Sequence, residues 1–340
     1  MTKAWCLRNF LAFSLVCGGV LVLPAFASTA SALTITPRVE LEADPGETIQ
    51  AQLKIANEER TSRTFYLRTE NFNSEDEFGN PSFTTRREGL STWVQAPLSI
   101  TLGPLQAIEI PIQISVPADA YPGGHYAALF FLSEPPQAEN SGDVALSSKL
   151  GSLILLRVNG DFAQGADILE FNTLDDRWFY SMLPVGFVYR FQNTGDDHLK
   201  PIGEIQVTNL IGQKVKILAG NPVDGNVLPK SVRRFSTIWT EKGGELIQQP
   251  VIDLPKSDAL SFWESAQYQM RNFKFGRYTA TLKLAFGTDG LQSDSQQVSF
   301  YIVPWQLFLI LIPLLIIVVL ILIWMIKRYN RYIIKRARAQ

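Results

Sequence analysis

The sequence predicts an all-β protein made of two immunoglobulin-like β-sandwich domains followed by a single C-terminal transmembrane α-helix. Three observations support this prediction. Apolar and polar residues alternate in many short segments of the middle of the chain, turn-forming residues separate these segments, and an uncharged apolar run of 20 residues lies near the C-terminus. The length of 340 residues leaves room for two domains beside that run.

The first 27 residues have the composition of a secretory signal peptide. Lys3 and Arg8 precede the uncharged apolar run 10–23, and small residues follow that run. We expect cleavage after Ala27, or as late as Ala32. The alternative is a membrane helix that is not cleaved.

Residues 33–165 form the first predicted β-sandwich. Its segments 49–55 and 108–116 alternate between apolar and polar positions, as strands do when one face lies on a core and the other in water. Pro111 falls on the polar face of its strand, which favours a sheet edge because proline has no N–H to donate. The polar segment 133–148 is expected to be a mobile loop.

Residues 166–303 form the second predicted β-sandwich, in which 278–286 is the clearest alternating strand. The segment 258–273 breaks this pattern, because its apolar residues recur at the spacing of one helix face. Phe262 and Trp263 on such an inserted helix are candidate contacts for a partner protein. The alternative is that the helix packs on its own domain or covers an edge strand.

Residues 305–326 are predicted to form a transmembrane helix. The uncharged part, 307–326, rises about 1.5 Å per residue and so spans the hydrocarbon core of a bilayer. The tail 327–340 is basic, which predicts a single-pass protein of the cell membrane with an extracytoplasmic body and a cytoplasmic tail, and membrane lipid as one partner. The residues expected at the two membrane surfaces are Trp305, Trp324, Lys327 and Arg328.

The composition speaks against several classes of function. The chain has 32 acidic and 31 basic residues, and eight of the basic ones lie in the two terminal segments, so the body is acidic and nucleic acid is not expected as a partner. Both cysteines, Cys6 and Cys17, lie in the predicted signal peptide. No catalytic, phosphate-binding or metal-binding motif occurs. We therefore predict no enzyme activity, no metal and no cofactor.

A few residues of the first domain are candidates for ligand or partner contact. Trp93 lies in the segment 91–94, after two hydroxyl-bearing residues, and other aromatic residues flank an acidic stretch, 75–77, that we expect to be flexible: Tyr66, Phe72, Phe78 and Phe83. Exposed aromatic rings in polar surroundings hold sugars or peptides. The alternative is that Trp93 fills the core. The other candidates follow a turn after Pro122 that requires positive φ, and they are Gly123, Gly124, His125 and Tyr126.

Several short motifs are shared with a known family. In the first domain they are Asp44-Pro45-Gly46-Glu47-Thr48, Lys54-Ile55-Ala56-Asn57 and the run 116–126, and in the second they are 193–195, 209–212, 227–229 and 275–278. With the order of signal, two sandwiches, one span and a basic tail, the chain resembles the WxL-interacting proteins of bacterial cell surfaces. The resemblance implies a first domain that binds peptidoglycan and a second domain that contacts a partner protein.

Three functions follow from these observations. The leading hypothesis is a non-catalytic, membrane-anchored adaptor that binds cell-wall polymer (peptidoglycan), surface proteins, or both. The alternative is a membrane-anchored assembly chaperone that acts through edge-strand pairing, with the strand 108–116 as its working edge. A membrane-bound hydrolase stays open only because carboxylates are numerous, and His125 would be its best candidate base.

Overall fold

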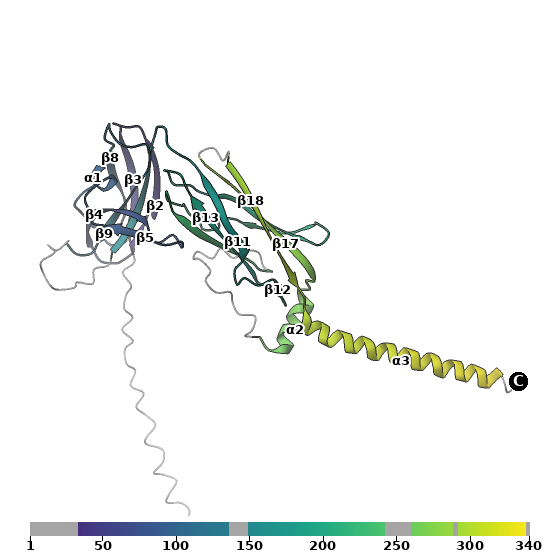
Figure 1. The fold of residues 1–340 in the computed structure, drawn as a ribbon. Helices are drawn as coiled ribbons and strands as arrows, with labels where there is room; N and C mark the ends of the chain where they lie inside the picture. Colours follow the sequence, from purple (N-terminus) through teal and green to yellow (C-terminus); the bar gives the residue numbers. More distant parts are fainter. Residues whose placement is uncertain (1–32, 136–148, 242–259, 288–291, 338–340) are drawn as a thin grey trace, which may run out of the picture.

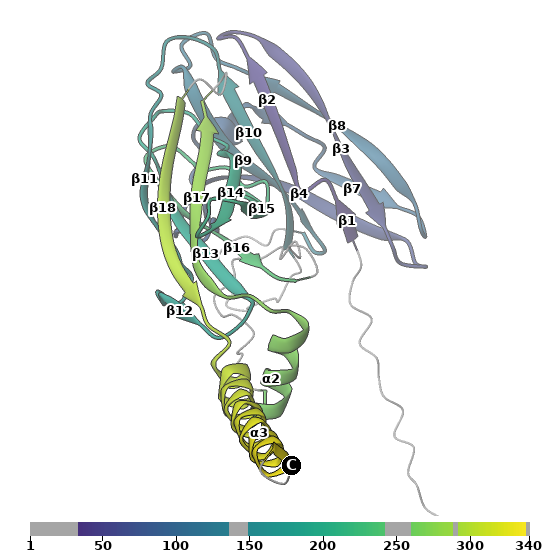
Figure 2. The same ribbon diagram turned by 90° about the vertical axis from the view of Figure 1, so that its right-hand side faces the viewer.

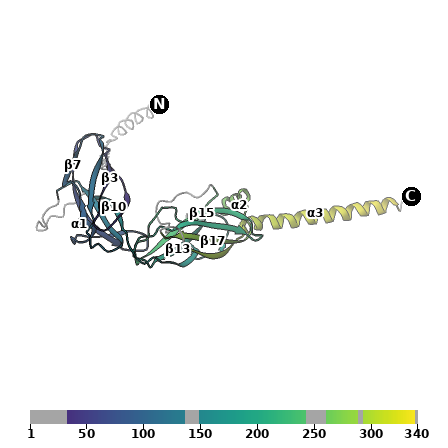
Figure 3. The ribbon, with the colours of Figure 1, turned by 90° about the horizontal axis from the view of Figure 1, so that it is seen from above.

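The computed structural model describes residues 33–135, 149–241, 260–287 and 292–337. Two β-sandwiches follow each other along the chain, and a long helix leaves the second sandwich at the end away from the first (Figures 1 and 3). The predicted signal peptide, with both cysteines, and most of the predicted loop 133–148 lie outside the described residues. The predictions of an all-β fold, of two immunoglobulin-like sandwiches and of one C-terminal apolar helix are confirmed.

The first sandwich consists of two facing sheets. One sheet has the strand order β1-β3-β8-β6, with β1 (Leu33–Ile35), β3 (Thr48–Asn57), β8 (Ala107–Ser115) and β6 (Val94–Gln95). The other has the order β2-β10-β9-β4-β5, with β7 also paired to β4: β2 (Arg38–Ala43), β10 (Lys149–Val158), β9 (Gly123–Leu132), β4 (Arg63–Ser74), β5 (Pro81–Thr84) and β7 (Ser99–Leu102). A short helix, α1 (Leu90–Trp93), leads into β6.

The alternating pattern of the sequence explains which side of each strand is buried. On β8, Ile110, Ile112 and Ile114 are buried in the core of the first sandwich, whereas Glu109 and Pro111 are exposed. The isoleucines face the opposite sheet because successive side chains of a strand point to opposite faces.

The second sandwich has a three-stranded and a five-stranded sheet. The first has the order β11-β13-β16, with β11 (Ala166–Thr173), β13 (Val185–Asn193) and β16 (Val232–Trp239). The second has the order β12-β18-β17-β14-β15, with β12 (Phe179–Tyr180), β18 (Gln292–Ile302), β17 (Gly276–Phe286), β14 (Ile202–Asn209) and β15 (Lys214–Ala219). Its core is rich in aromatic rings: Tyr189 stacks on Phe235 with 5.1 Å between ring centroids, and Phe300 is fully buried.

Two helices lie at the far end of the second sandwich (Figure 2). Helix α2 (Phe262–Arg271) begins at a capping box, in which Ser261 and Glu264 each accept a hydrogen bond from the other's backbone N–H. Helix α3 (Trp305–Ala337) follows β18 directly and is long and apolar enough to cross a membrane over Trp305–Tyr332. It continues past the predicted end at residue 326, since no glycine or proline interrupts the basic segment that follows.

Replacing Phe300 with alanine should destabilise the protein by about 3–5 kcal/mol, because the ring is fully buried among Tyr180, Phe187 and Tyr278. The measurement is denaturant unfolding of the detergent-solubilised chain. Gln297→Ala, on the exposed face of the same strand, is the control and should change stability by about 0.5 kcal/mol at most. Equal effects of the two substitutions would contradict the described core.

Candidate functional site

The two sandwiches meet at a seam, defined here as the set of contacts between the first and second sandwich. One part of the seam is a small apolar cluster, in which Leu228 of the second sandwich packs against Phe72, Ala128, Phe130 and Leu155 of the first. The rest of the seam consists of charged side chains, amides and backbone groups.

A buried carboxylate lies at the centre of the polar part. Asp197, on the loop between β13 and β14, is 3% exposed and accepts hydrogen bonds from Arg157 Nε of β10 and from the backbone N–H of His198. Asn193 Nδ2 donates to the Asp197 carbonyl (2.7 Å), which fixes the loop. Burial by itself would raise the pKa of Asp197, but the contacts with His198 and Arg157 outweigh it and hold the pKa below its ordinary value. One carboxylate therefore joins the two domains.

The double glycine predicted as a turn is part of the same contact. Gly123 has φ of +115°, and a Cβ at this position would lie 2.7 Å from the carbonyl oxygen of Asp196. Gly124 N donates to that oxygen (3.0 Å), and a side chain at 124 would collide with the hydroxyl of Tyr126. The two glycines let the second domain approach the backbone of the first, which is a structural reason for them that needs no ligand.

Tyr126 lies on the same side of the seam. Its hydroxyl is 3.4 Å from His198 Nδ1, and the two rings meet edge to face. Burial, and then the negative charge of Asp197, raise the pKa of Tyr126, so the hydroxyl stays neutral. Tyr126 is therefore a packing and hydrogen-bonding residue of the seam.

A second polar contact joins β2 to the second sandwich. Arg38 pairs with Asp224 (2.9 Å), and Lys200 pairs with the same carboxylate (2.9 Å). Next to this group, Asn226 Nδ2 donates to Glu40 Oε1 (2.8 Å).

A third contact involves the acidic stretch 75–77. Glu77, in the turn between β4 and β5, pairs with Arg190 of β13 (Nε to Oε2, 2.8 Å), and its carbonyl accepts from the N–H of Arg234. The hydrogen bond from Arg190 holds the pKa of Glu77 below its ordinary value. The stretch that we predicted to be flexible is thus bound by the second domain at Glu77, a contact that the sequence does not reveal.

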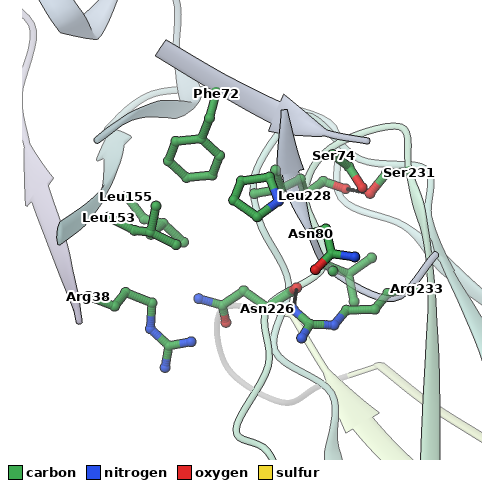
Figure 4. Close-up of a pocket in the computed structure, with 13 residues that line it drawn as sticks. Arg38, Phe72, Ser74, Asn80, Leu153, Leu155, Asn226, Leu228, Ser231 and Arg233 are labelled. Atoms are coloured by element: carbon green, nitrogen blue, oxygen red, sulfur yellow. Dashed lines mark hydrogen bonds between the residues drawn. The ribbon is translucent and has the colours of Figure 1, made fainter. Parts of the chain in front are cut away.

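A pocket of about 70 Å³ opens at the seam (Figure 4). Phe72, Leu153 and Leu155 form its apolar side, and Arg38 and Asn226 lie across from them. The volume suffices for a few water molecules or one small polar group.

Arg233 is the unusual residue of this pocket. Its Nη1 donates to the Asn226 carbonyl (2.7 Å), while its Nε and the side-chain oxygen of Asn226 are buried without a hydrogen-bond partner. Among the described residues, no carboxylate lies within ion-pair distance of its guanidinium. Burial, and then the nearby charge of Arg38, lower the pKa of Arg233. The pocket therefore suits a small hydrogen-bond acceptor, such as a carbonyl or carboxylate oxygen.

The remaining predicted site residues lie outside the seam. Trp93 packs on the core of the first sandwich and its ring lies 4.6 Å from that of His125. His125 Nε2 is 2.8 Å from the Tyr121 carbonyl oxygen, an arrangement that stabilises the turn before β9. Phe262 and Trp263 lie on α2 at the opposite end of the second sandwich (Figure 2). The predicted residues thus fall into three separate groups.

Two strands of the first sandwich have edges that are only partly covered. β1 pairs with β3 only at residues 55–57, and β6 pairs with β8 only at 113–114. β3 and β8 pair with each other along their length. Within the described residues, the other half of each outer edge has no strand beside it.

The hydrogen-bond register shows which backbone groups these edges offer. Val116 N donates to Glu47 O, so the odd-numbered residues of β3 bond to the even-numbered residues of β8. The even-numbered residues of β3 face outward, and accordingly Thr36 N donates to Lys54 O (2.9 Å).

The two open edges differ in their donors. On β3 the outward backbone groups of Thr48, Gln50 and Gln52 all include an N–H. On β8 Pro111 is one of the outward residues, so this edge lacks a donor there, as its position on the polar face predicted. β3 is therefore the better template for an added strand, although the sequence pointed to β8.

The residues that hold the seam were missed in the sequence for a physical reason. Their contacts join positions up to 186 residues apart, which no local pattern reveals. One signal was present: Arg157 directly follows the apolar run 153–156 of its strand, and a charge in such a position needs a partner when it is buried.

No group of three or more His, Cys, Asp or Glu side chains that could hold a metal ion occurs in the part of the chain that the structure describes.

Comparison with protein-family models and with curated proteins finds no match. The resemblance to WxL-interacting proteins therefore stays a prediction. Among solved structures, the chain is similar to the class 5 fimbriae chaperone CfaA (10% identity, TM-score 0.36, 80% of this chain and 100% of that chain covered), the E. coli chaperone DraB (12%, 0.33, 80% and 97%) and the Pseudomonas aeruginosa CupB2 chaperone (10%, 0.32, 77% and 97%).

Gly123→Ala should weaken the seam more than Gly276→Ala. Both glycines have φ of +115°, but a Cβ at 276 meets nothing within 4 Å. Comparison of the two variants therefore distinguishes the effect of backbone strain, which both have, from the collision with Asp196, which only Gly123→Ala has. We expect about 1–2 kcal/mol of destabilisation from strain in both variants, and an additional loss with faster proteolysis between the domains in Gly123→Ala only. Identical behaviour would contradict the close approach.

Acid should loosen the seam. The folded-state pKa of Asp197 lies below its ordinary value of 3.8, so its contribution to stability is present above that pH and is lost as the pH falls below it. The measurement is the free energy of unfolding between pH 7 and pH 3 for the natural chain and for Asp197→Asn. The variant should be less stable by about 2 kcal/mol at pH 7 and should lose less stability in acid. Parallel pH profiles would contradict this role.

Proposed function

We propose that the chain is a membrane-anchored, non-catalytic assembly factor of the chaperone type, which holds an extended segment of a surface protein along the open edge of β3. The observation that carries this proposal is the outward row of backbone groups at Thr48, Gln50 and Gln52, which have no strand beside them in the described structure. An extended peptide can add to such an edge through main-chain hydrogen bonds.

The chemistry of this edge fits a partner that is unfolded or extended when it binds. Three donors and three acceptors alternate along the edge, and the side chains of Thr48, Gln50 and Gln52 are exposed beside them. Main-chain pairing is largely independent of the partner's sequence, so one edge can serve several related proteins. This is the property that an assembly factor needs.

The terminal segments support an anchored position for this activity. A signal peptide, the apolar part of α3 and a basic tail together favour a single span with both sandwiches on the extracytoplasmic side. The first sandwich, which carries the open edge, is the one further from α3 (Figure 3). A surface protein leaving the membrane would meet it at a fixed distance.

The adaptor hypothesis for cell-wall polymer remains a prediction. Its candidate residues Trp93 and His125 contact each other, and Trp93 packs on the core of its own domain. The open edge of β3 therefore favours the assembly factor over the wall adaptor.

Gln50→Pro should reduce capture of the partner about 5- to 100-fold. The substitution removes one outward donor and leaves the partner's carbonyl unpaired, which costs about 1–3 kcal/mol, while the bonds between β3 and β8 are unaffected. The matched control is Gln50→Ala, which keeps the N–H and should capture normally. Capture is measured by photo-crosslinking from position 52, an outward residue of the same edge that neither substitution changes, in the full chain in cells, with position 283 on the doubly paired strand β17 as the reference.

A second comparison distinguishes the two edges and the two functions. Pro111→Ala adds a backbone N–H donor to the outer edge of β8. Unchanged capture of the partner supports β3 as the binding edge. Increased capture, with crosslinks from position 109, would place the binding edge on β8. The chain can also be sedimented with purified cell wall. If it sediments equally well with and without Gln50→Pro and gives no protein crosslinks, the assembly factor is contradicted and the adaptor is favoured.

A further inference from the structure

Exposed aromatic side chains gather at the end of the second sandwich from which α3 leaves. On one side lie Trp178, Phe179 and Tyr301, where β12 pairs with the last residues of β18. On the other lie Trp263, Phe273 and Phe275, on α2 and the segment after it. We call these six residues the aromatic collar. Trp178 is 69% exposed and Trp263 is 71% exposed, which is unusual for tryptophan, whereas Trp239 of the same sandwich is buried in its core.

Helix α2, which carries Trp263 of the collar, is fixed to the first turn of α3 by a buried amide pair. Gln269 of α2 is 1% exposed, and its side-chain amide donates to Gln306 Oε1. The side-chain oxygen of Gln269 accepts a hydrogen bond from Leu307 N (3.0 Å). This N–H belongs to the first turn of α3 and has no partner within the helix. Helix α2 therefore cannot leave α3 without exposing unpaired buried groups.

Ring contacts define the level of the collar along α3. Phe273 and Phe275 lie 6.4 and 5.3 Å from Phe308, measured between ring centroids, and Phe262 lies 6.2 Å from Trp305. Phe308 is three residues into the helix, or about 4.5 Å along its axis from Trp305. Where α3 crosses a bilayer, Trp305 lies in the interfacial layer. Residues that contact Phe308 then lie at the depth of the head groups and the outermost acyl carbons.

The polar groups around the collar are compatible with this depth. The carboxylate of Glu264 is bound by the hydroxyl and N–H of Ser261, and Lys274 pairs with Glu241 (3.3 Å). Arg271, at the end of α2, is exposed and available to lipid phosphate. Aromatic rings with polar neighbours are the composition that prefers the membrane interface.

We propose that the aromatic collar is a second membrane-binding site, in which α2 lies in the head-group layer and holds the second sandwich against the bilayer. The inference rests on the proposed anchoring through α3. It gives the protein two lipid contacts, the span and the aromatic collar, and these two contacts together orient the second sandwich where the span alone would leave it free to tilt.

Depth-dependent quenching tests this site in the full chain. The two natural cysteines are first removed by Cys6→Ser and Cys17→Ser. Single cysteines are then introduced in the collar region by Trp263→Cys and by Met270→Cys, of which the second keeps every collar ring. Two references are Ile316→Cys in the apolar part of α3 and Tyr121→Cys on the first sandwich, where Tyr121 is 84% exposed. Each is labelled with an environment-sensitive fluorophore. The chain is then placed in phosphatidylcholine vesicles that carry a nitroxide either near the head group or deep in the acyl chain.

We expect the labels at 263 and 270 to lose at least half of their emission to the shallow quencher, the label at 316 to be quenched more by the deep one, and the label at 121 to be affected by neither. If 316 is quenched while 263 and 270 behave like 121, the span is inserted and the collar proposal is overturned. A blue-shifted but unquenched label at 263 and 270 would show a protein cover and would also overturn it. If 316 itself is not quenched, the proposed anchoring fails and the collar with it.

Discussion

The two sandwiches have separate hydrophobic cores, so the contacts of the seam, a small apolar cluster around Leu228 and several polar contacts, decide how the domains are placed relative to each other. Polar interfaces between domains usually allow movement. Here the buried carboxylate of Asp197, the Glu77–Arg190 pair and the close approach at Gly123 are directional, and they contact the second sandwich at different points. Together they define one arrangement, on which the position of the β3 edge relative to α3 depends.

A similar principle operates at the membrane end. Gln269 accepts a hydrogen bond from Leu307 N in the first turn of α3. Collar rings lie on two sides of the junction between β18 and α3. Buried amide and charge contacts thus occur at both joints of the molecule, between the sandwiches and between the second sandwich and the span. Such contacts favour a fixed geometry because separating two hydrogen-bonded groups leaves each of them unpaired at a site that water does not reach.

The sequence predicts the strands and the span well because their signals are local. Alternation predicts the buried isoleucines of β8, and the polar-face proline predicts an edge. The inserted helix is also predictable by its periodicity, but its packing on α3 is not, because it depends on contacts between distant residues, such as the Gln269–Gln306 pair and the rings of Phe262 and Trp305. The residues of the seam cannot be predicted for the same reason. For Trp93, the sequence could not distinguish an exposed ring from one packed on a core, because an aromatic residue in a polar stretch fits both. The β3 edge emerges only from the register, since it depends on where β1 stops pairing.

The most direct test of a rigid two-domain arm is a distance measurement between spin labels at Leu98 on the first sandwich and Leu210 on the second, both highly exposed, in the full chain in vesicles. A single narrow distance distribution, the same in vesicles and in detergent, is expected if the seam fixes the domains. A broad or multiple distribution would show that the sandwiches move independently, and the seam would then not determine where the open edge lies.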